Sequence, residues 1–408
     1  MNSCSLILRG GNVVTPGSRR PQRLDIVIGA DGRIAQICPE APSAPAVREI
    51  DLAGRLVTPG LVDAHQHLDK SRTRTAVANP EGTLEGAIAG FAAYAAGMTR
   101  EDVMARAERT IDACVERGTV ALRSHADVKV DIGCSGVEAL AELRTRCAGR
   151  IQLQVVAFLT EYVLGPRVTQ AFEDAIAVGA DVIGGAPAIA GDTEAYLDLL
   201  FAAAVRHGLP LDLHLDEHLD AGRQHFDKVI ERTRANGLQG RVVASHACVL
   251  SAMAPSEADR VIEGLVEAGI GVITLPAANL FLQGRASDAL PPRGTTRIRE
   301  LIAAGVPVAA ASDNIQDPFI PIGSGDLLEI ARWTLVAGHL GAEDIATAFD
   351  MVTAAPARLM ALGDGYGLHE GARADLLITD AQDAEDLVVS GPLERAVLSG
   401  GQVVAGAL

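Results

Sequence analysis

Eight short apolar segments, separated by helical stretches and loops, recur through the middle of this 408-residue chain. This alternation constrains the fold most, because alternating strands and helices build a parallel sheet, and eight strands close such a sheet into a barrel. The segments span residues 56–65, 119–125, 151–158, 180–186, 209–215, 241–246, 269–275 and 306–313. We therefore predict an α/β fold with a (β/α)8 barrel of the TIM type. An open doubly wound sheet is the alternative, and it fits less well because no GxGxxG turn follows an early strand.

Two of the intervening stretches, residues 101–118 and 193–208, show a clear helical pattern. Both are amphipathic, and each ends at a glycine, Gly118 or Gly208, that suits the end of a helix. The two chain ends instead alternate short apolar runs with glycine-rich turns, which is typical of strands. We predict that residues 1–57 and 366–408 form one small β-sandwich domain, and that residues 58–365 form the barrel.

The composition favours a protein that handles a small molecule. Hydrophobic residues make up 48% of the chain and aromatic residues only 3%, so the core must be mostly Ala, Val, Leu and Ile. The formal net charge of −17 argues against nucleic-acid binding, which needs clustered Lys and Arg. No apolar run reaches about 18 residues, so we expect no membrane span.

The expected location is the cytoplasm. The six cysteines contain no CxxC pair, and the first residues lack the pattern of a signal peptide. The expected partner is a small-molecule substrate, and a homo-oligomer is left open.

Candidate metal-binding side chains gather at the predicted carboxyl ends of the strands, where barrel enzymes carry their active sites. Five histidines and one aspartate share this position: His65, His67, His125, His214, His246 and Asp313. Residues two apart on a strand point to the same side, so His65 and His67 can converge on one ion. A catalytic divalent metal needs a few imidazole and carboxylate ligands and an open position for water. The pattern therefore predicts a metal site.

Several motifs also carry a resemblance to a known family. They are PGLVDAHQHLDKSRT, SHADV, LQVVAF, LHLDE, SHA, ASDNIQDPF, the stretch NLFLQGRASDALPPRGTTRIRELIAAG, and GLHEGARADLLITD near the end. Over essentially the whole chain they resemble the amidohydrolase superfamily, and within it the cytosine deaminase branch. SDNI with the following Asp317, and then PIGSGDLLE, are also similar to the isopropylammelide hydrolases of that branch.

The resemblance implies a catalytic role for each residue of the site. The implied ligands of a single Zn²⁺ or Fe²⁺ are His65, His67, His214 and Asp313. Glu217 matches the glutamate that shuttles protons to a ring nitrogen, and His246 matches the histidine that hydrogen-bonds the metal-bound hydroxide. Asp313 is expected to accept the nucleophile's proton as well.

The number of metals follows from a missing residue. Two-metal members of the superfamily bridge their ions with a carboxylated lysine at the end of the fourth strand. No lysine occurs between Lys129 and Lys228, which favours a site with one metal.

Two positions depart from the cytosine deaminases. Thr160 stands where those enzymes carry a glutamine that reads the pyrimidine, and Asn314 stands where they carry a second aspartate. We expect both residues to contact substrate, and the departures weaken cytosine itself as the substrate. His125 is a third candidate, for which a hydrogen bond within the barrel mouth is the equal alternative.

The sequence thus predicts a metal-dependent aminohydrolase that cleaves a C–N bond of a small nitrogen heterocycle through metal-bound hydroxide. A cyclic amidohydrolase that opens a lactam or ureide ring remains an alternative, as does a non-catalytic binding protein on the same scaffold. The substrate, the leaving group (ammonia or an alkylamine), the choice of Zn²⁺ or Fe²⁺, and the oligomeric state stay open.

Overall fold

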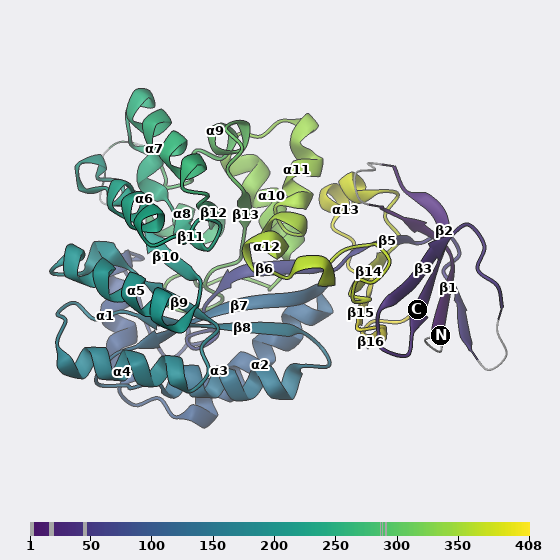
Figure 1. Ribbon diagram of the computed structural model, residues 1–408, viewed down its shortest axis with the longest axis horizontal. Helices are drawn as coiled ribbons and strands as arrows, with labels where there is room; N and C mark the ends of the chain where they lie inside the picture. The colour runs from purple at the N-terminus through teal and green to yellow at the C-terminus, as the bar shows by residue number, and fades with distance from the viewer. Residues whose placement is uncertain (1–3, 16–19, 44–46, 286, 288, 290–291) are drawn as a thin grey trace.

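The protein consists of a barrel and a smaller body built from both chain ends, as Figure 1 shows. The computed structural model describes residues 4–15, 20–43, 47–285, 287, 289 and 292–408. Within these ranges, no helix combines the length and the apolar character needed to cross a membrane.

The barrel is an eight-stranded sheet in which every pair of neighbouring strands is parallel and follows chain order. The strands are β6 (Leu61–Gln66), β7 (Thr119–Val128), β8 (Gln152–Leu159), β9 (Val182–Gly185), β10 (Leu211–Leu215), β11 (Val242–His246), β12 (Gly271–Thr274) and β13 (Val308–Ala310). Each lies within or overlaps one of the eight predicted segments, and the predicted (β/α)8 barrel is confirmed.

The barrel closes where its first and last strands meet. The backbone N–H of Asp313 donates to the carbonyl oxygen of His65 over 2.9 Å, and Gln66 pairs with Asp313 as an isolated parallel bridge. This seam lies at the carboxyl ends of the strands, so closure itself brings two predicted metal ligands together.

Helices cover the outside of the barrel. They are α1 (Leu84–Ala95), α2 (Arg100–Glu116), α3 (Ser135–Cys147), α4 (Pro166–Ala177), α5 (Thr193–His207), α6 (Phe226–Ala235), α7 (Pro255–Glu267), α8 (Pro276–Leu282), α9 (Ile298–Ala303), α10 (Leu327–Ala337), α11 (Ile345–Asp350) and α12 (Ala354–Leu359). The two predicted helices correspond to α2 and α5. Helix α5 begins at the N-cap Asp192 and ends before Gly208, which adopts a φ of +66° as the sequence predicted.

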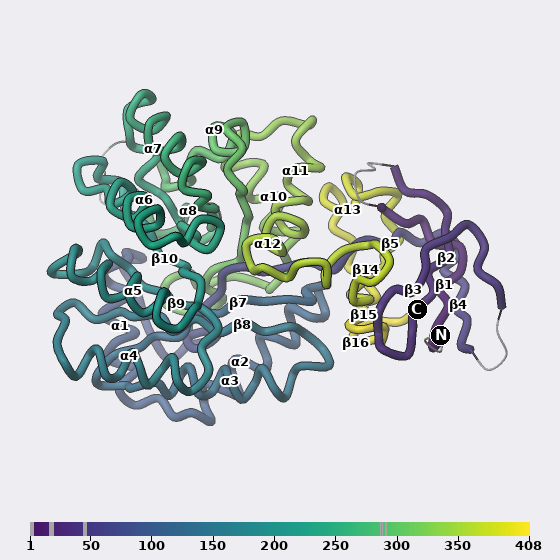
Figure 2. Tube along the Cα trace, viewed as in Figure 1, coloured from purple at the N-terminus to yellow at the C-terminus, as the bar shows by residue number. Residues whose placement is uncertain are grey.

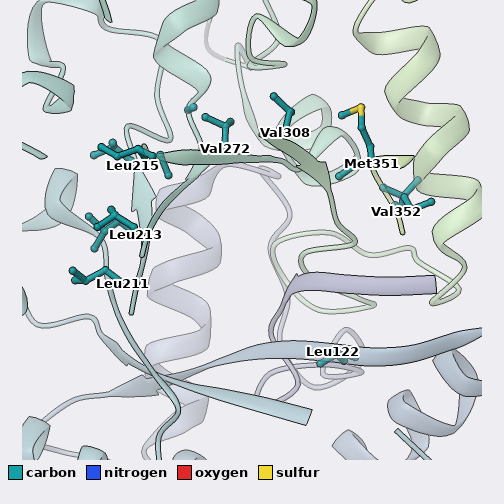
Figure 3. Close-up of a cluster of buried hydrophobic side chains, with 14 of the residues drawn as sticks. Leu122, Leu211, Leu213, Leu215, Val272, Val308, Met351 and Val352 are labelled. Atoms are coloured by element: carbon teal, nitrogen blue, oxygen red, sulfur yellow. The ribbon is translucent and has the colours of Figure 1, made fainter. Parts of the chain in front are cut away.

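The main core lies between the strands and the helices. Figure 3 shows Leu211, Leu213 and Leu215 on one side of β10, where they join this apolar cluster. Side chains alternate along a strand, so Asp212 and His214 face the opposite side, toward the barrel interior. The same strand therefore supplies both packing and polar site residues.

The second sheet combines strands from the two ends of the chain. Its members are β1 (Cys4–Val13), β2 (Gln22–Gly29), β3 (Ile34–Cys38), β4 (Arg48–Asp51), β5 (Leu56–Pro59), β14 (Leu376–Thr379), β15 (Arg395–Ser399) and β16 (Gln402–Ala405). The strands surround an apolar cluster of their own, and Figure 2 traces both chain ends into this body. Helix α13 (Ala384–Ser390) lies between β14 and β15 in the chain. The domain boundaries proposed from the sequence stay a prediction.

A buried ion pair fastens this sheet to the barrel. Arg395 of β15 donates from both terminal nitrogens to Asp326, the N-cap of α10, over 2.9 and 2.7 Å. A third donation reaches the carbonyl oxygen of Arg117, after α2. Bidentate geometry is the strong form of such a pair.

Replacing Arg395 with methionine should destabilise the protein, because the carboxylate of Asp326 would stay buried without its cation. We expect the free energy of unfolding to fall by about 3 to 5 kcal/mol. Arg260→Met, at the exposed pair with Asp227, should change the free energy of unfolding far less, because solvent screens this pair. Urea denaturation followed by the fluorescence of Trp333, the one tryptophan in the sequence, measures both. Equal losses of unfolding free energy in the two variants would show that the buried pair between Arg395 and Asp326 does not hold the sheet against the barrel.

Candidate active site

The four predicted metal ligands meet at the carboxyl end of the barrel. The Nε2 atoms of His67 and His214 lie 3.0 Å apart. Asp313 Oδ1 lies 3.6 Å from His65 Nε2 and 3.4 Å from His67 Nε2. All four side chains are buried. The structure therefore brings together residues that are up to 248 positions apart in the chain, 65 to 313.

This geometry fits a divalent metal. With metal–nitrogen distances of about 2.1 Å, two ligands of a tetrahedral ion lie about 3.4 Å apart, close to the three distances here. His65 Nε2 and Asp313 Oδ1 also lack any hydrogen-bond partner although they are buried. Buried polar atoms are rarely left unpaired, so these two atoms are suited to an ion.

Burial sets the protonation of these groups. It lowers the pKa of His67 and of His214 well below the usual histidine range, helped by the neighbouring cationic groups. Both imidazoles are therefore neutral at physiological pH, the form that binds a metal. Burial also raises the pKa of Asp313 to about 6.

Three non-glycine residues at the strand ends have left-handed backbones. The φ angles of Asp216, His246 and Asp313 are +53°, +67° and +60°. Such conformations cost free energy and tend to occur at functional sites. At the ends of β10, β11 and β13 the chain therefore tolerates a strained backbone conformation that sets the direction of the side chain.

His246 lies beside the predicted ligands and is oriented by Asn279 of α8. The amide nitrogen of Asn279 lies 3.0 Å from His246 Nδ1 and donates to it. The ring proton of the neutral imidazole then resides on Nε2, which is buried and has no partner. His246, His65 and Asp313 have donor atoms within 4.8 Å of one another. His246 thus presents an N–H toward the centre.

Glu217 lines the same cavity. Its Oε1 lies 3.6 Å from His246 Nδ1, and its backbone oxygen accepts a hydrogen bond from Gln283. Burial, together with the nearby carboxylates of Asp313 and Glu85, raises the pKa of Glu217 well above its usual range. Glu217 can therefore hold a proton at neutral pH, as a general acid must.

The cavity above these residues has a volume of about 330 Å³. One wall comes from α1 and the residues around it: Leu84, Ile88, Phe91, Ala92, Ala95 and Ala96. Thr160 and Asn314 also line the cavity, as the sequence led us to expect of substrate contacts. The Thr160 hydroxyl is buried without a partner, and the Asn314 amide donates to Asp317.

His125 does not line this cavity. Its ring lies 4.0 Å from that of His65, fully buried, and neither ring nitrogen has a hydrogen-bond partner. Its Nε2 lies 3.5 Å from Asp212 Oδ1, and one of its ring nitrogens lies within 4.8 Å of ring nitrogens of His65 and His214.

The sequence reasoning missed two parts of the site. The apolar run of α1 carries only one charged residue, Glu85, which was the available signal for an inserted helix. Asn279 lies five residues beyond β12, and the end of that strand carries no histidine or acidic residue to signal it.

Comparison with known proteins places the chain in a family. The chain matches the amidohydrolase family over residues 48–138 and 132–405. It belongs to that family. The resemblance drawn from the motifs is confirmed.

Three relatives illustrate this membership. A pterin deaminase of Rhizobium rhizogenes is 32% identical, with 95% of this chain and 89% of the relative covered. The structure of a 5-methylcytosine deaminase from Klebsiella pneumoniae superposes with a TM-score of 0.91 at 31% identity, covering 98% of each chain. The structure of an N-isopropylammelide isopropylaminohydrolase from Burkholderia multivorans superposes with a TM-score of 0.85 at 32% identity, covering 99% of this chain and 98% of that one. The chain is accordingly a hydrolase of carbon–nitrogen bonds other than peptide bonds.

Glu217→Gln should stabilise the metal-free protein at neutral and alkaline pH. A carboxyl whose pKa is raised on folding destabilises the folded state once the pH exceeds its unfolded value of about 4.3. The neutral amide escapes this penalty, so the thermal midpoint of the variant should exceed that of the wild type at pH 8. The difference should vanish near pH 4, where both side chains are neutral. A difference in thermal midpoint that does not change with pH would show that burial does not raise the pKa of Glu217.

Proposed function

We propose that the protein is a metal-dependent deaminase of an amino-substituted nitrogen heterocycle. The observation that carries this proposal is the position of Glu217, whose pKa burial raises well above its usual range, in the cavity that His67, His214 and Asp313 also line. Ring nitrogens are weak bases that need such an acid when the carbon beside them is attacked.

The proposed ligands of one divalent ion are His65, His67, His214 and Asp313, supported by their mutual distances and by the two unpartnered atoms. Zn²⁺ or Fe²⁺ suits this set of imidazoles and one carboxylate. A bound ion of this kind lowers the pKa of water towards neutrality and so supplies a nucleophile at physiological pH.

The protein's own residues manage the protons. Asp313 takes the proton of the attacking water, for which a pKa of about 6 suits it. His246 donates a hydrogen bond from Nε2 to the attacking oxygen and holds that oxygen over the ring carbon. Glu217 gives its proton to the adjacent ring nitrogen. When the tetrahedral carbon collapses, Asp313 passes the proton it took from the water to the amino group, which leaves as ammonia or an amine, and the hydroxyl proton of the adduct returns to Glu217.

The cavity supports a substrate larger than a single unsubstituted ring. A volume of about 330 Å³ lies within the usual range for small-molecule sites. Its wall on α1 is apolar, whereas His67, His214, His246, Glu217 and Asp313 supply polar groups to the same cavity. The names of the three relatives refer to pterin, 5-methylcytosine and N-isopropylammelide. Each of these compounds carries a second ring or an alkyl group.

A release assay tests the proposal. Protein loaded with Zn²⁺ or Fe²⁺ should release one equivalent of ammonia or alkylamine from at least one member of a panel. The panel holds pterin, cytosine, 5-methylcytosine, isocytosine, creatinine, aminotriazines and N-isopropylammelide. Substrate consumption with neither product would indicate ring opening instead. No turnover combined with no bound metal would favour a binding protein.

Glu217→Gln should lower kcat on the identified substrate by at least about a hundredfold, because the amide cannot donate the carboxyl proton. KM and metal content should change little. Glu231→Gln, an exposed glutamate on α6, is the matched control and should leave kcat unchanged. Full activity in the Glu217 variant would refute its role as the proton donor.

Ala92→Leu should narrow the cavity at the α1 wall. We expect kcat/KM for a two-ring or N-alkylated substrate to fall about tenfold or more, with a smaller loss for cytosine. Ala93→Leu, exposed on the same helix but outside the cavity, controls for effects on the helix itself. Equal losses for large and small substrates would show that the wall does not select for size.

A further inference from the structure

A buried ion pair lies inside the barrel, beneath the proposed metal ligands. Arg123 of β7 donates from Nη1 to Asp212 Oδ2 of β10 over 2.9 Å, and both side chains are almost completely buried. The other two guanidinium nitrogens donate as well, Nε to Gln154 Oε1 and Nη2 to the carbonyl oxygen of Leu359 at the end of α12. Asp212 is therefore held in place as a carboxylate by its cation.

The second oxygen of this carboxylate connects to His65. Ser245 of β11 donates its hydroxyl proton to Asp212 Oδ1 over 2.6 Å. Ser245 Oγ also lies 2.9 Å from His65 Nδ1. A hydroxyl has one proton to give, and the carboxylate takes it, so the Ser245 oxygen can only accept from His65.

The hydrogen bond from His65 Nδ1 to the Ser245 oxygen sets the tautomer of His65. With the ring proton on Nδ1, the lone pair lies on Nε2, the atom that faces Asp313 without a hydrogen-bond partner. Asp212 is two residues before His214 on β10, and side chains two apart face the same way, which places the carboxylate directly under the site. Figure 3 shows the leucines of this strand on the other side.

We propose that Asp212, acting through Ser245 and anchored by Arg123, positions His65 for metal binding. The inference rests on the proposed metal function. These three residues are positioning residues, because none of them lines the substrate cavity. Hydrogen-bond partners behind a metal-binding histidine fix its tautomer and raise its basicity.

Ser245→Ala is the informative test, because it removes the hydroxyl that bridges Asp212 and His65 and leaves the Arg123–Asp212 pair intact. The direct separation of 3.7 Å between Asp212 Oδ1 and His65 Nδ1 is too long for a hydrogen bond to replace it. We expect the Zn²⁺ dissociation constant, measured by competition with a chromogenic chelator, to rise about tenfold or more. The visible spectrum of the Co²⁺-substituted protein should shift as well, since His65 can then change tautomer or rotate. Asp212→Asn should weaken Zn²⁺ binding too, by about ten- to a hundredfold, provided that the variant folds.

Ser399→Ala is the matched control. Its hydroxyl is likewise buried and paired with a charged side chain, Arg373, but it lies in the sheet of the chain ends. Its Zn²⁺ affinity should stay within twofold of the wild type. A Ser245→Ala protein with wild-type Zn²⁺ affinity and an unchanged Co²⁺ spectrum would overturn the inference. Wild-type protein that binds neither Zn²⁺ nor Fe²⁺ would instead refute the proposed function, which separates the two failures.

Discussion

The hydrogen bond that closes the barrel is the constraint on which the site depends. Asp313 donates from its backbone to the carbonyl oxygen of His65, and so joins the last strand to the first. Because both residues also carry proposed metal-binding side chains, the same seam closes the sheet and completes the ligand set. A chain with the same side chains on an open sheet would leave these two groups at opposite edges.

The sequence predicted those features that follow from strand order alone. Parallel strands in a barrel all end on one face, so reading the last residues of each segment was enough to find His65, His214 and Asp313. His67 lies just beyond β6 yet still reaches the site, while Gln66 between the histidines turns outward to Asp63 and Ser312. The pairing of β6 with β7 is irregular between Asp63 and Gln66, so these two side chains meet although strict alternation would separate them.

Other features depend on neighbours that the linear sequence does not reveal. Arg123 and Asp212 are 89 residues apart, and Asp212 and Ser245 are 33 apart. Ser245 begins the SHA motif, but no motif or spacing joins it to Asp212 or Arg123, so only the packing of β7, β10 and β11 shows their connection. Similarly, α1 has the composition of a core helix, and only its position over the barrel mouth identifies it as a cavity wall. Substrate choice depends on that shape, which is why the residues alone left it open.

The left-handed backbones of Asp216, His246 and Asp313 have an evolutionary consequence. Glycine would fit each of these positions with less strain, by about 1 to 2 kcal/mol. Two of the three side chains contribute to the proposed chemistry, so selection for stability and selection for catalysis oppose each other there. In a duplicated gene that no longer encodes an active enzyme, substitutions to glycine at these three positions would no longer be selected against. Their identity in any descendant would therefore record whether that lineage still depends on the reaction.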